Sequence, residues 1–341
     1  MKVLHILSSN KFSGAENVAC QIIDMFRNDI EMAYCSPKGD IEKELRDRGV
    51  KYFSIDKLTY KEVKKVVDEF HPDILHAHDL RACAIVSKFK MKKVAHIHVN
   101  HPQMSKIGVR SILAKSILSK FNKIVWVSKS CLEDYVFANR FRNENSLILS
   151  NIISLENLNM RAKNAEVQNA HDVVYCGRLC EQKNPLRLVE VCKQLVEKDK
   201  EISIGIIGNG DMFEIVSSKI KEYKLDKNVK LYGFVSNPLG AIKNSSVMIL
   251  TSFFEGTPMT ALESMGLGVP VISTKTDGMI DLIEQNINGY LYDTDEECCD
   301  EILRLKNHAK ELKNLQKTTK DFAQQYNDVE KYKKKILSLY E

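Results

Sequence analysis

Two basic side chains in the second half of the chain have the types and spacing of a site for an anionic ligand. Arg178 and Lys183 follow the apolar run 173–176, and Pro185 stands near the first turn of the next predicted helix. Fixed cations just beyond a strand can stabilise the charge that develops on a departing diphosphate as its bond to carbon breaks. The alternative interpretation is a pair of solvated side chains on a loop.

Two acidic side chains, Glu255 and Glu263, are separated by seven residues further along the chain. Thr257 is a favourable N-cap and Pro258 a favourable first helical residue, so a helix is predicted to begin here and to end at the glycines of segment 266–268. Glu255 then lies at the helix N-terminus, and Glu263 lies roughly 7.5 Å further along the axis. Such a pair could hold hydroxyl groups at both ends of a sugar diphosphate nucleoside.

The first half of the chain offers Gly14, in a loop that joins the first predicted strand to the first helix. A glycine there lets a ligand approach the backbone, and the helix-end amides favour an anion. A purely structural glycine at such a turn is the alternative. The loop does not match the G-x-G-x-x-G pattern of dinucleotide sites, so we expect no cofactor.

Histidines gather after two predicted strands of the first half. His96, His98 and His101 lie in VAHIHVNHP, and their spacing permits a metal hypothesis. Because no Asp or Glu stands within that segment to complete a ligand set, we predict no metal there. His76 and His78, in ILHAHD, are interpreted as structural or cleft-lining residues.

All of these residues follow short apolar runs that alternate with helical patterns. The predicted strands cover residues 3–7, 31–35, 74–77, 93–98 and 123–127, and then 173–176, 202–207, 230–232, 247–251 and 269–273. Such runs, separated by helices, indicate parallel sheets with helices on both faces. Open sheets of this kind bind ligands at the carboxyl ends of their strands, so two of them facing across a cleft would share one site.

A chain of 341 residues is too long for a single core of typical size. We predict an N-terminal Rossmann-like domain over 1–155, a polar linker over 156–170 and a second Rossmann-like domain over 171–325. The Lys-rich amphipathic segment 326–341 is predicted to dock back on the N-terminal domain.

Charge is divided unevenly between the two halves. Residues 1–155 hold 25 Lys and Arg against 17 Asp and Glu, whereas the remainder holds 25 against 28. A basic first half suggests a phosphate-bearing acceptor or an anionic membrane surface, and without a nucleic-acid motif we expect no nucleic acid partner. Residues 105–120 interleave cations with aliphatic side chains, which is typical of a helix lying on anionic lipid or of a surface helix burying its apolar stripe.

Composition also bears on location. The chain has no run of eighteen uncharged apolar residues, and its first apolar run is too short for a signal peptide. Its nine cysteines form no C-x-x-C pair, which suits reduced thiols. We therefore expect a cytoplasmic protein, with peripheral contact to the inner face of the plasma membrane as an option.

The sequence resembles the retaining GT-B glycosyltransferases of family 4, and is most similar to those of bacterial surface-polysaccharide assembly. The resemblance is carried by the loop Ser13-Gly14-Ala15-Glu16, the Gly-Arg-x4-Lys segment that begins at Gly177, and the Glu-x7-Glu block with its surrounding glycines and prolines. It spans nearly the whole chain. It implies the GT-B fold, with an N-terminal acceptor domain and a C-terminal nucleotide-sugar domain.

The resemblance also implies an activity: a retaining, metal-independent, hexosyltransferase-type enzyme moves a sugar from a nucleotide sugar, UDP-linked, to a hydroxyl of a growing, lipid-linked surface glycan. The implied catalytic residues are Arg178, Lys183, Glu255 and His98. The implied substrate-binding residues are Gly14, Gly177, Gly210, Phe234, Gly256, Thr257, Pro258, Met259 and Glu263, with Glu263 on the ribose and the loop around Phe234 on the base. A nucleotide-sugar epimerase of the same architecture is the alternative, and a non-catalytic nucleotide-sugar-binding partner of another transferase is a second rival.

Overall fold

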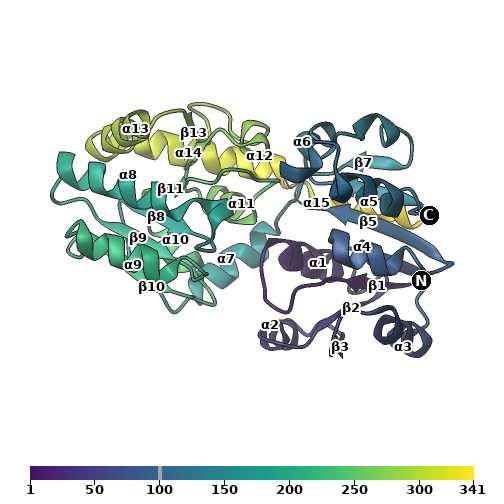
Figure 1. Ribbon diagram of the computed structural model, residues 1–341. Helices are drawn as coiled ribbons and strands as arrows, with labels where there is room; N and C mark the ends of the chain where they lie inside the picture. The colour runs from purple at the N-terminus through teal and green to yellow at the C-terminus, as the bar shows by residue number, and fades with distance from the viewer. Residues whose placement is uncertain (99–101) are drawn as a thin grey trace. The chain divides into compact units, whose positions relative to one another are not determined.

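The computed structural model describes residues 1–98 and 102–341, which divide into two compact units (Figure 1). Met1–Asn151 and Val329–Glu341 form the first unit, and Ile152–Asp328 form the second. Each unit is built on one sheet whose strands pair in parallel, with helices between successive strands. The predicted α/β class with two Rossmann-like sheets is therefore confirmed.

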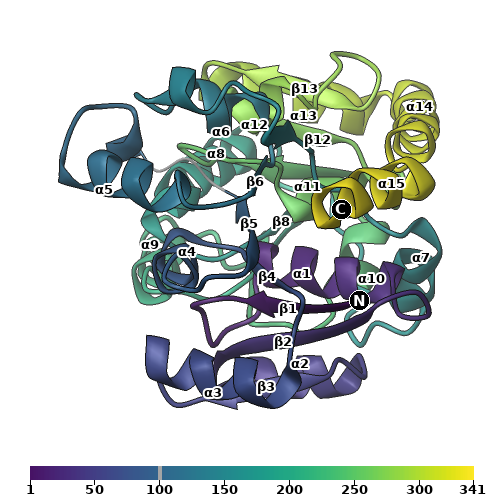
Figure 2. The same cartoon turned by 90° about the vertical axis from the view of Figure 1, so that its right-hand side faces the viewer.

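The first unit has a seven-stranded sheet in the order β3-β2-β1-β4-β5-β6-β7, and most of this order can be followed in Figure 2. Its strands are β1 (Lys2–Ile6), β2 (Glu31–Pro37), β3 (Tyr52–Ile55), β4 (Ile74–Ala77), β5 (Lys92–Ile97), β6 (Lys123–Trp126) and β7 (Ser146–Ile148). Its helices are α1 (Gly14–Met25), α2 (Ile41–Asp47), α3 (Tyr60–Phe70), α4 (Leu80–Val86), α5 (Val109–Leu118), α6 (Lys129–Glu133) and α15 (Val329–Tyr340), with the 3-10 turns η1 (Pro102–Met104) and η2 (Ala138–Arg140).

The C-terminal helix α15 belongs to the first unit although it follows the second in sequence. Its last residue, Tyr340, is buried, and its hydroxyl lies 2.8 Å from Nδ1 of His76 on β4. Lys92 Nζ donates to the Tyr340 carbonyl oxygen over 2.9 Å, which ties the helix end to β5. Through these contacts α15 packs against one face of the central strands.

The second unit has a six-stranded sheet in the order β10-β9-β8-β11-β12-β13. Its strands are β8 (Val173–Cys176), β9 (Ile204–Ile207), β10 (Val229–Gly233), β11 (Val247–Leu250), β12 (Val271–Thr274) and β13 (Gly289–Tyr292). Its helices are α7 (Leu155–Lys163), α8 (Pro185–Lys198), α9 (Phe213–Glu222), α10 (Leu239–Lys243), α11 (Met259–Gly266), α12 (Asp277–Ile280), α13 (Asp295–Asn307) and α14 (Ala309–Tyr326), with the 3-10 turn η3 (Glu181–Lys183).

Local details differ from the sequence prediction in two places. Helix α11 begins at Met259 with Pro258 as its N-cap, so the assignment of Thr257 as N-cap was wrong by one position: Pro258 has an extended ψ of 124° and stands outside the helix. Helix α7 occupies much of segment 156–170, for which we predicted a linker; its N-cap is Ser154, whose side chain accepts a hydrogen bond from the Asn157 amide. Among the described residues, no helix combines the length and apolarity needed to cross a bilayer.

Candidate active site

The loop after β8 carries the two candidate cations of the second unit. Arg178 is exposed, whereas Lys183 ends the turn η3 and is half-buried. Asn184 follows in the left-handed conformation, with φ of 48°, and its side chain accepts a hydrogen bond from the Arg187 amide. This turn and cap hold Lys183 directly in front of α8, at the carboxyl end of the central strand.

Two glycines allow the loop after β8 and the loop after β9 to pack closely against each other. A Cβ on Gly208 would lie 1.8 Å from the Gly177 carbonyl oxygen, and one on Gly210 would lie 2.2 Å from the Leu179 carbonyl oxygen. The Leu179 amide donates to the Asn209 carbonyl over 3.0 Å in the same contact. Gly210, which we predicted to bind substrate, thus has a packing role that no larger residue could fill.

The Glu255 carboxylate lies at the end of the neighbouring strand, β11, and is paired with Lys183. Lys183 Nζ and Glu255 Oε1 are 2.5 Å apart, and Ser252 Oγ donates to the same oxygen over 2.5 Å. The side chains are 16% and 5% exposed, so the pair is largely removed from water. The sequence had assigned Lys183 to a ligand's diphosphate and Glu255 to its sugar, without this direct contact.

The pairing leaves the lysine able to bind an anion. An ammonium group has three N–H donors, and one of them is directed at Glu255. The remaining two can reach phosphate oxygens while the carboxylate fixes the position of the nitrogen. Glu255 thereby becomes a residue that positions Lys183, whatever else it contacts.

Backbone contacts between the loops after β8 and β11 hold the ion pair in place. The Phe253 amide donates to the Gln182 carbonyl over 2.9 Å, and Gln182 Nε2 donates to the Phe254 carbonyl over 3.1 Å. Thr251 Oγ1 donates to the Lys183 carbonyl over 3.0 Å. These hydrogen bonds join the two loops into one layer and fix the backbone on both sides of the charged pair.

The first turn of α12 contacts the backbone at Glu255. The Gly278 amide donates to the Glu255 carbonyl over 3.2 Å, and a Cβ on Gly278 would lie only 1.2 Å from the Gly256 carbonyl oxygen. The backbone of residues 255–256 therefore packs directly against the start of α12. This close approach explains why residue 278 is a glycine.

The charged residues affect two different groups at the end of β8. Burial raises the pKa of the Cys176 thiol to about 12, with Glu263 also raising it and Lys183 lowering it. Burial likewise raises the pKa of the Tyr175 hydroxyl, and among its neighbours Glu255 raises this pKa and Arg178 lowers it. The structure therefore brings Lys183 and Glu255 into direct contact, with Arg178 in the same loop as Lys183 and Glu263 on α11.

Other predicted binding residues border this layer. Gly256, Thr257, Pro258 and Met259 lead into α11, where Glu263 is half-buried one turn further on. The loop after β10 is joined to the one after β9 by a hydrogen bond of 2.8 Å from the Gly208 amide to the Gly233 carbonyl, and Phe234 just beyond is 73% exposed. An aromatic ring left in solvent at the edge of a polar site is free to stack on a planar ligand.

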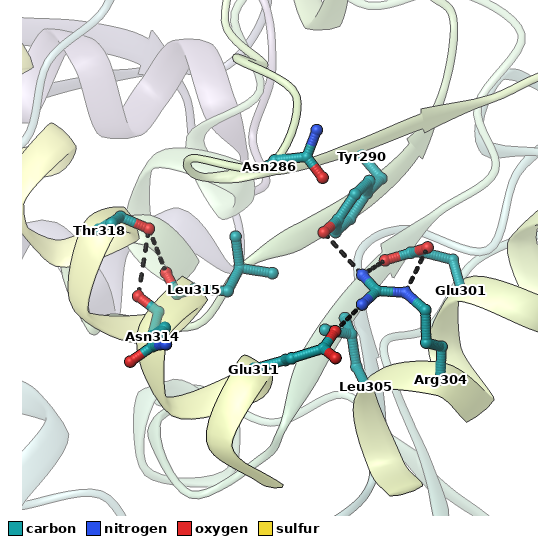
Figure 3. Close-up of a pocket in the computed structure, with 9 residues that line it drawn as sticks. All are labelled: Asn286, Tyr290, Glu301, Arg304, Leu305, Glu311, Asn314, Leu315 and Thr318. Atoms are coloured by element: carbon teal, nitrogen blue, oxygen red, sulfur yellow. Dashed lines mark hydrogen bonds and ion pairs between the residues drawn. The ribbon is translucent and has the colours of Figure 1, made fainter. Parts of the chain in front are cut away.

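Two hollows of the second unit lie elsewhere. One, of about 380 Å³, lies between β13, α13 and α14 and is lined by Tyr290, Glu301, Arg304 and Glu311 among others (Figure 3). Its cation is already engaged, because Arg304 donates to Glu301, to Glu311 and to the Tyr290 hydroxyl. The other, of about 490 Å³, is lined by residues such as His171 and Ser203 that precede β8 and β9, at the opposite end of the strands from the charged layer.

In the first unit, the structure places Gly14 at the first position of α1, after Ser13 as N-cap. Ser13 Oγ is hydrogen-bonded to the Glu16 carboxylate, so these two side chains of the predicted loop contact each other. The Ser8 amide donates to Asp79 Oδ2 over 2.8 Å, which joins the loop after β1 to the loop after β4. The loop is therefore braced from two sides.

Sequence reasoning missed a cluster of five histidines in the first unit. His5 packs with the expected pair His76 and His78, and this pair packs with His96 and His98. The ring centroids are 4.3 to 5.4 Å apart, and every pair is stacked except His5 and His78, which are tilted. His101 lies outside the described residues. The sequence does carry a signal for His5, which is a histidine within the first predicted strand. Residues in register on adjacent parallel strands lie on the same face of the sheet, and His5 is in register with His76.

The two Rossmann-like units, each built on one parallel sheet, have the GT-B fold. Residues 156–322 match the family model described as glycosyl transferases group 1. The second unit is therefore similar to that family over most of its length. The expected GT-B fold is confirmed, and the match does not favour the epimerase alternative.

Three similar proteins illustrate the family. The capsular polysaccharide biosynthesis glycosyltransferase CapH of Staphylococcus aureus is 26% identical over 315 residues, which cover 86% of this chain and 85% of that protein. The lipopolysaccharide 1,6-galactosyltransferase of Salmonella typhimurium is 26% identical over 301 residues, 82% of each chain. The structure of HepE from Anabaena in complex with UDP-glucose superposes with a TM-score of 0.85 at 19% identity and covers 99% of this chain and 98% of that one.

Proposed function

We propose that this protein is a retaining, hexosyltransferase-type glycosyltransferase that moves a sugar from a UDP-sugar to a hydroxyl of a growing, lipid-linked surface glycan. The observation that carries the proposal is the largely buried pair of Lys183 and Glu255 at the carboxyl ends of the central strands of the second unit. The names of the relatives support the substrate class, since they include a capsule and a lipopolysaccharide enzyme. The HepE complex supports UDP as the nucleotide.

In this proposal the cations of the chain stabilise the leaving group. Arg178 and the two remaining donors of Lys183 bind the diphosphate, and their fixed charges offset the charge that develops as the sugar–phosphate bond breaks. Because Glu255 pairs with Lys183 through Oε1, we assign it to positioning that lysine and not to attack on the sugar. We therefore propose attack on the face from which the diphosphate departs, with a phosphate oxygen taking the acceptor's proton.

The remaining residues are proposed to hold the rest of the donor. Glu263 binds the ribose hydroxyls, Phe234 stacks at the base, and the backbone at Gly177 and over 256–259 contacts the diphosphate or the sugar. In the first unit, His98 contacts the transferred sugar or the acceptor, and Gly14 gives close access to the backbone. Each assignment can be tested by a single substitution.

The deciding experiment is product analysis. Purified protein is incubated with a panel of UDP-sugars and a glycan acceptor in excess EDTA, and the anomeric configuration of the product is read by NMR. We expect transfer with retention in the presence of chelator. Inversion would contradict the mechanism, and activity lost to EDTA and restored by a divalent ion would contradict metal independence. Change of the donor sugar without acceptor would revive the epimerase.

We also propose that the surface around α5 contacts an anionic membrane. Ile107, Val109, Ile112 and Leu113 are 73%, 85%, 52% and 56% exposed, although the same helix buries Ala114, Ile117 and Leu118. A helix that merely packs its apolar stripe leaves no such second apolar face. The cations 106, 110, 115 and 120 surround it, and this mixture suits anionic lipid, where a lipid-linked acceptor resides.

Vesicle sedimentation tests the membrane proposal. We expect the protein to sediment with phosphatidylglycerol vesicles, and V109S/L113S to weaken sedimentation severalfold. Ile215→Ser is the matched control, because Ile215 is 50% exposed on α9 of the other unit. Equal sedimentation of the wild type with neutral phosphatidylcholine vesicles would refute the electrostatic part of the proposal. Unchanged sedimentation of the double variant would refute the apolar part.

A further inference from the structure

The histidine cluster lies on one face of the first unit's sheet, the face that α15 covers. Side chains alternate along a strand, and the neighbours Leu4, Leu75 and Ala95 belong to the hydrophobic core of the opposite face. The cluster therefore forms a layer of imidazoles across β1, β4 and β5. It reaches the carboxyl edge of the sheet at His98, which is half-buried, whereas His5 is fully buried.

Three of the rings form a hydrogen-bonded chain. His5 Nδ1 and His78 Nε2 are 2.8 Å apart, and His78 Nδ1 and His98 Nε2 are 3.1 Å apart. A neutral imidazole has one N–H donor and one lone pair, so His78 must donate in one of these bonds and accept in the other. Both bonds then point the same way along the chain, and only two arrangements of protons are possible.

All three rings are neutral at neutral pH. Burial lowers the pKa of His5 and of His98 to about 3. Burial also lowers the pKa of His78 well below its usual value, with smaller effects from the neighbouring imidazoles, of which His76 is the largest. The two arrangements of the hydrogen-bonded histidines therefore differ in tautomer and not in charge.

The two ends of the chain decide between the arrangements. Among the described residues, His5 Nε2 and His98 Nδ1 are buried and have no hydrogen-bond partner. One of them must carry a proton and the other a lone pair. A buried N–H without a partner is rarer in proteins than an unsatisfied acceptor. Either arrangement leaves one unpaired N–H, and the half-buried His98 tolerates it better than His5, which is fully buried.

We propose that His78, anchored by His5, positions His98 as the tautomer protonated at Nδ1, so that His98 presents a hydrogen-bond donor to an oxygen of the sugar substrate and has no lone pair there to remove a proton. His78 and His5 are positioning residues in this scheme. The part of the inference that concerns the substrate rests on the proposed function, whereas the tautomer does not. Proton removal from the acceptor then falls to the departing phosphate.

A metal ion is the competing explanation for so many buried nitrogens. Two triads, His5-His76-His78 and His78-His96-His98, offer nitrogen atoms within 4.8 Å of one another. Two nitrogens bound to one zinc ion at about 2.0 to 2.1 Å can be no more than about 4.2 Å apart. A metal bound at either triad would take a nitrogen of His78 that is already hydrogen-bonded to His5 or to His98, so the tautomer chain fits the observed contacts better.

The test is the tautomeric state of His98 in the full-length apo protein, read from the ¹⁵N shifts of its two ring nitrogens by long-range ¹H–¹⁵N NMR. We expect a protonated Nδ1 and an unprotonated Nε2 in the wild type. His78→Phe removes the donor, and His98 should then shift toward protonation at Nε2, which is the preference of free histidine. His78→Asn keeps an amide donor near the position of Nδ1 and should restore the wild-type tautomer.

Tyr340→Phe is the matched control, because its hydroxyl bonds His76 in the same buried layer but lies outside the chain. It should leave the His98 tautomer unchanged. Protonation of His98 at Nε2 in the wild type would overturn the inference even if His78→Phe failed to fold, as would an unchanged tautomer in a folded His78→Phe. Stoichiometric uptake of Zn²⁺ with displacement of the shifts of His78 and His98 would support the metal instead.

Kinetic measurements then separate the tautomer of His98 from its proposed role in sugar transfer. With the transferase assay in hand, His78→Phe should lower kcat about tenfold with little change in KM for the donor, and His78→Asn should recover most of it. If the NMR result holds but no transfer is seen with any UDP-sugar, the proposed function fails while the positioning of His98 stands. If transfer occurs and the tautomer is wrong, only this inference fails.

Discussion

Replacing Lys183 by methionine tests the central pair of the candidate site, because it removes a charge from a side chain of similar length. The partner, Glu255, is 5% exposed and would keep only the hydrogen bond from Ser252 Oγ. Removing one member of a buried ion pair leaves an uncompensated charge and typically costs about 3 to 5 kcal/mol of the free energy of unfolding. Since Lys183 itself is 16% exposed, we expect the lower end, about 3 kcal/mol.

Thermal unfolding measures this cost. For a unit of this size, 1 kcal/mol corresponds to about 2 to 4 °C, so the transition of the second unit should fall by about 6 to 12 °C. The double variant K183M/E255Q should recover much of the loss, because neither buried charge is then left. Lys198→Met is the control: its partner Asp300 is 64% exposed, and such surface pairs contribute less than about 1 kcal/mol.

The same variant tests the leaving-group role. Loss of a charge-assisted hydrogen bond to the diphosphate, worth about 1.5 to 3 kcal/mol, should reduce turnover by about ten- to a hundredfold. Turnover is measured at a temperature where circular dichroism shows the variant folded. A shift of the transition no larger than that of Lys198→Met would show that the pair is screened by water. Near-normal turnover would remove Lys183 from the mechanism.

Three further outcomes are expected. Glu263→Ala should weaken UDP binding in calorimetry by about tenfold, the loss of one or two hydrogen bonds, while the exposed Glu222→Ala leaves it unchanged; equal affinity in both would refute the ribose assignment. Gly278→Ala should lower the free energy of unfolding by about 3 kcal/mol, since its Cβ would lie 1.2 Å from the Gly256 carbonyl oxygen. Gly108→Ala, with open space around its Cβ, should cost far less. Similar melting temperatures for the two variants would show that the backbone around Gly256 shifts to make room for the methyl group. The first unit should lose stability as the pH falls from about 6.5 toward 3, because the buried His5, with its pKa lowered to about 3, binds a proton only on unfolding. For this residue the free energy of unfolding should change by about 1.4 kcal/mol per pH unit. Denaturant titrations at several pH values should give a shallower slope for His5→Phe than for the wild type, and equal slopes would contradict the prediction.

The sequence predicted the central strands better than the edges of the sheets. Strands β8 and β11 are continuous apolar runs, and β1 and β4 are buried runs interrupted by one histidine each, because helices cover both of their faces. The strands that sequence reasoning did not identify, β3, β7 and β13, are all at sheet edges, where residues are partly exposed and the apolar pattern is broken. A pattern method detects burial, and an edge strand is only partly buried.

The sequence by itself determined the α/β class, the repetition of that class in two halves, and the identity of the charged residues that follow the strands, because each of these depends on residues close together in the chain. Only the tertiary structure decided how those residues are paired. Lys183 and Glu255 are separated by 72 positions and meet because parallel strands β8 and β11 end side by side. His5, His78 and His98 come from three strands in the same way, and their shared proton chain is a property of the sheet's register and not of any one segment.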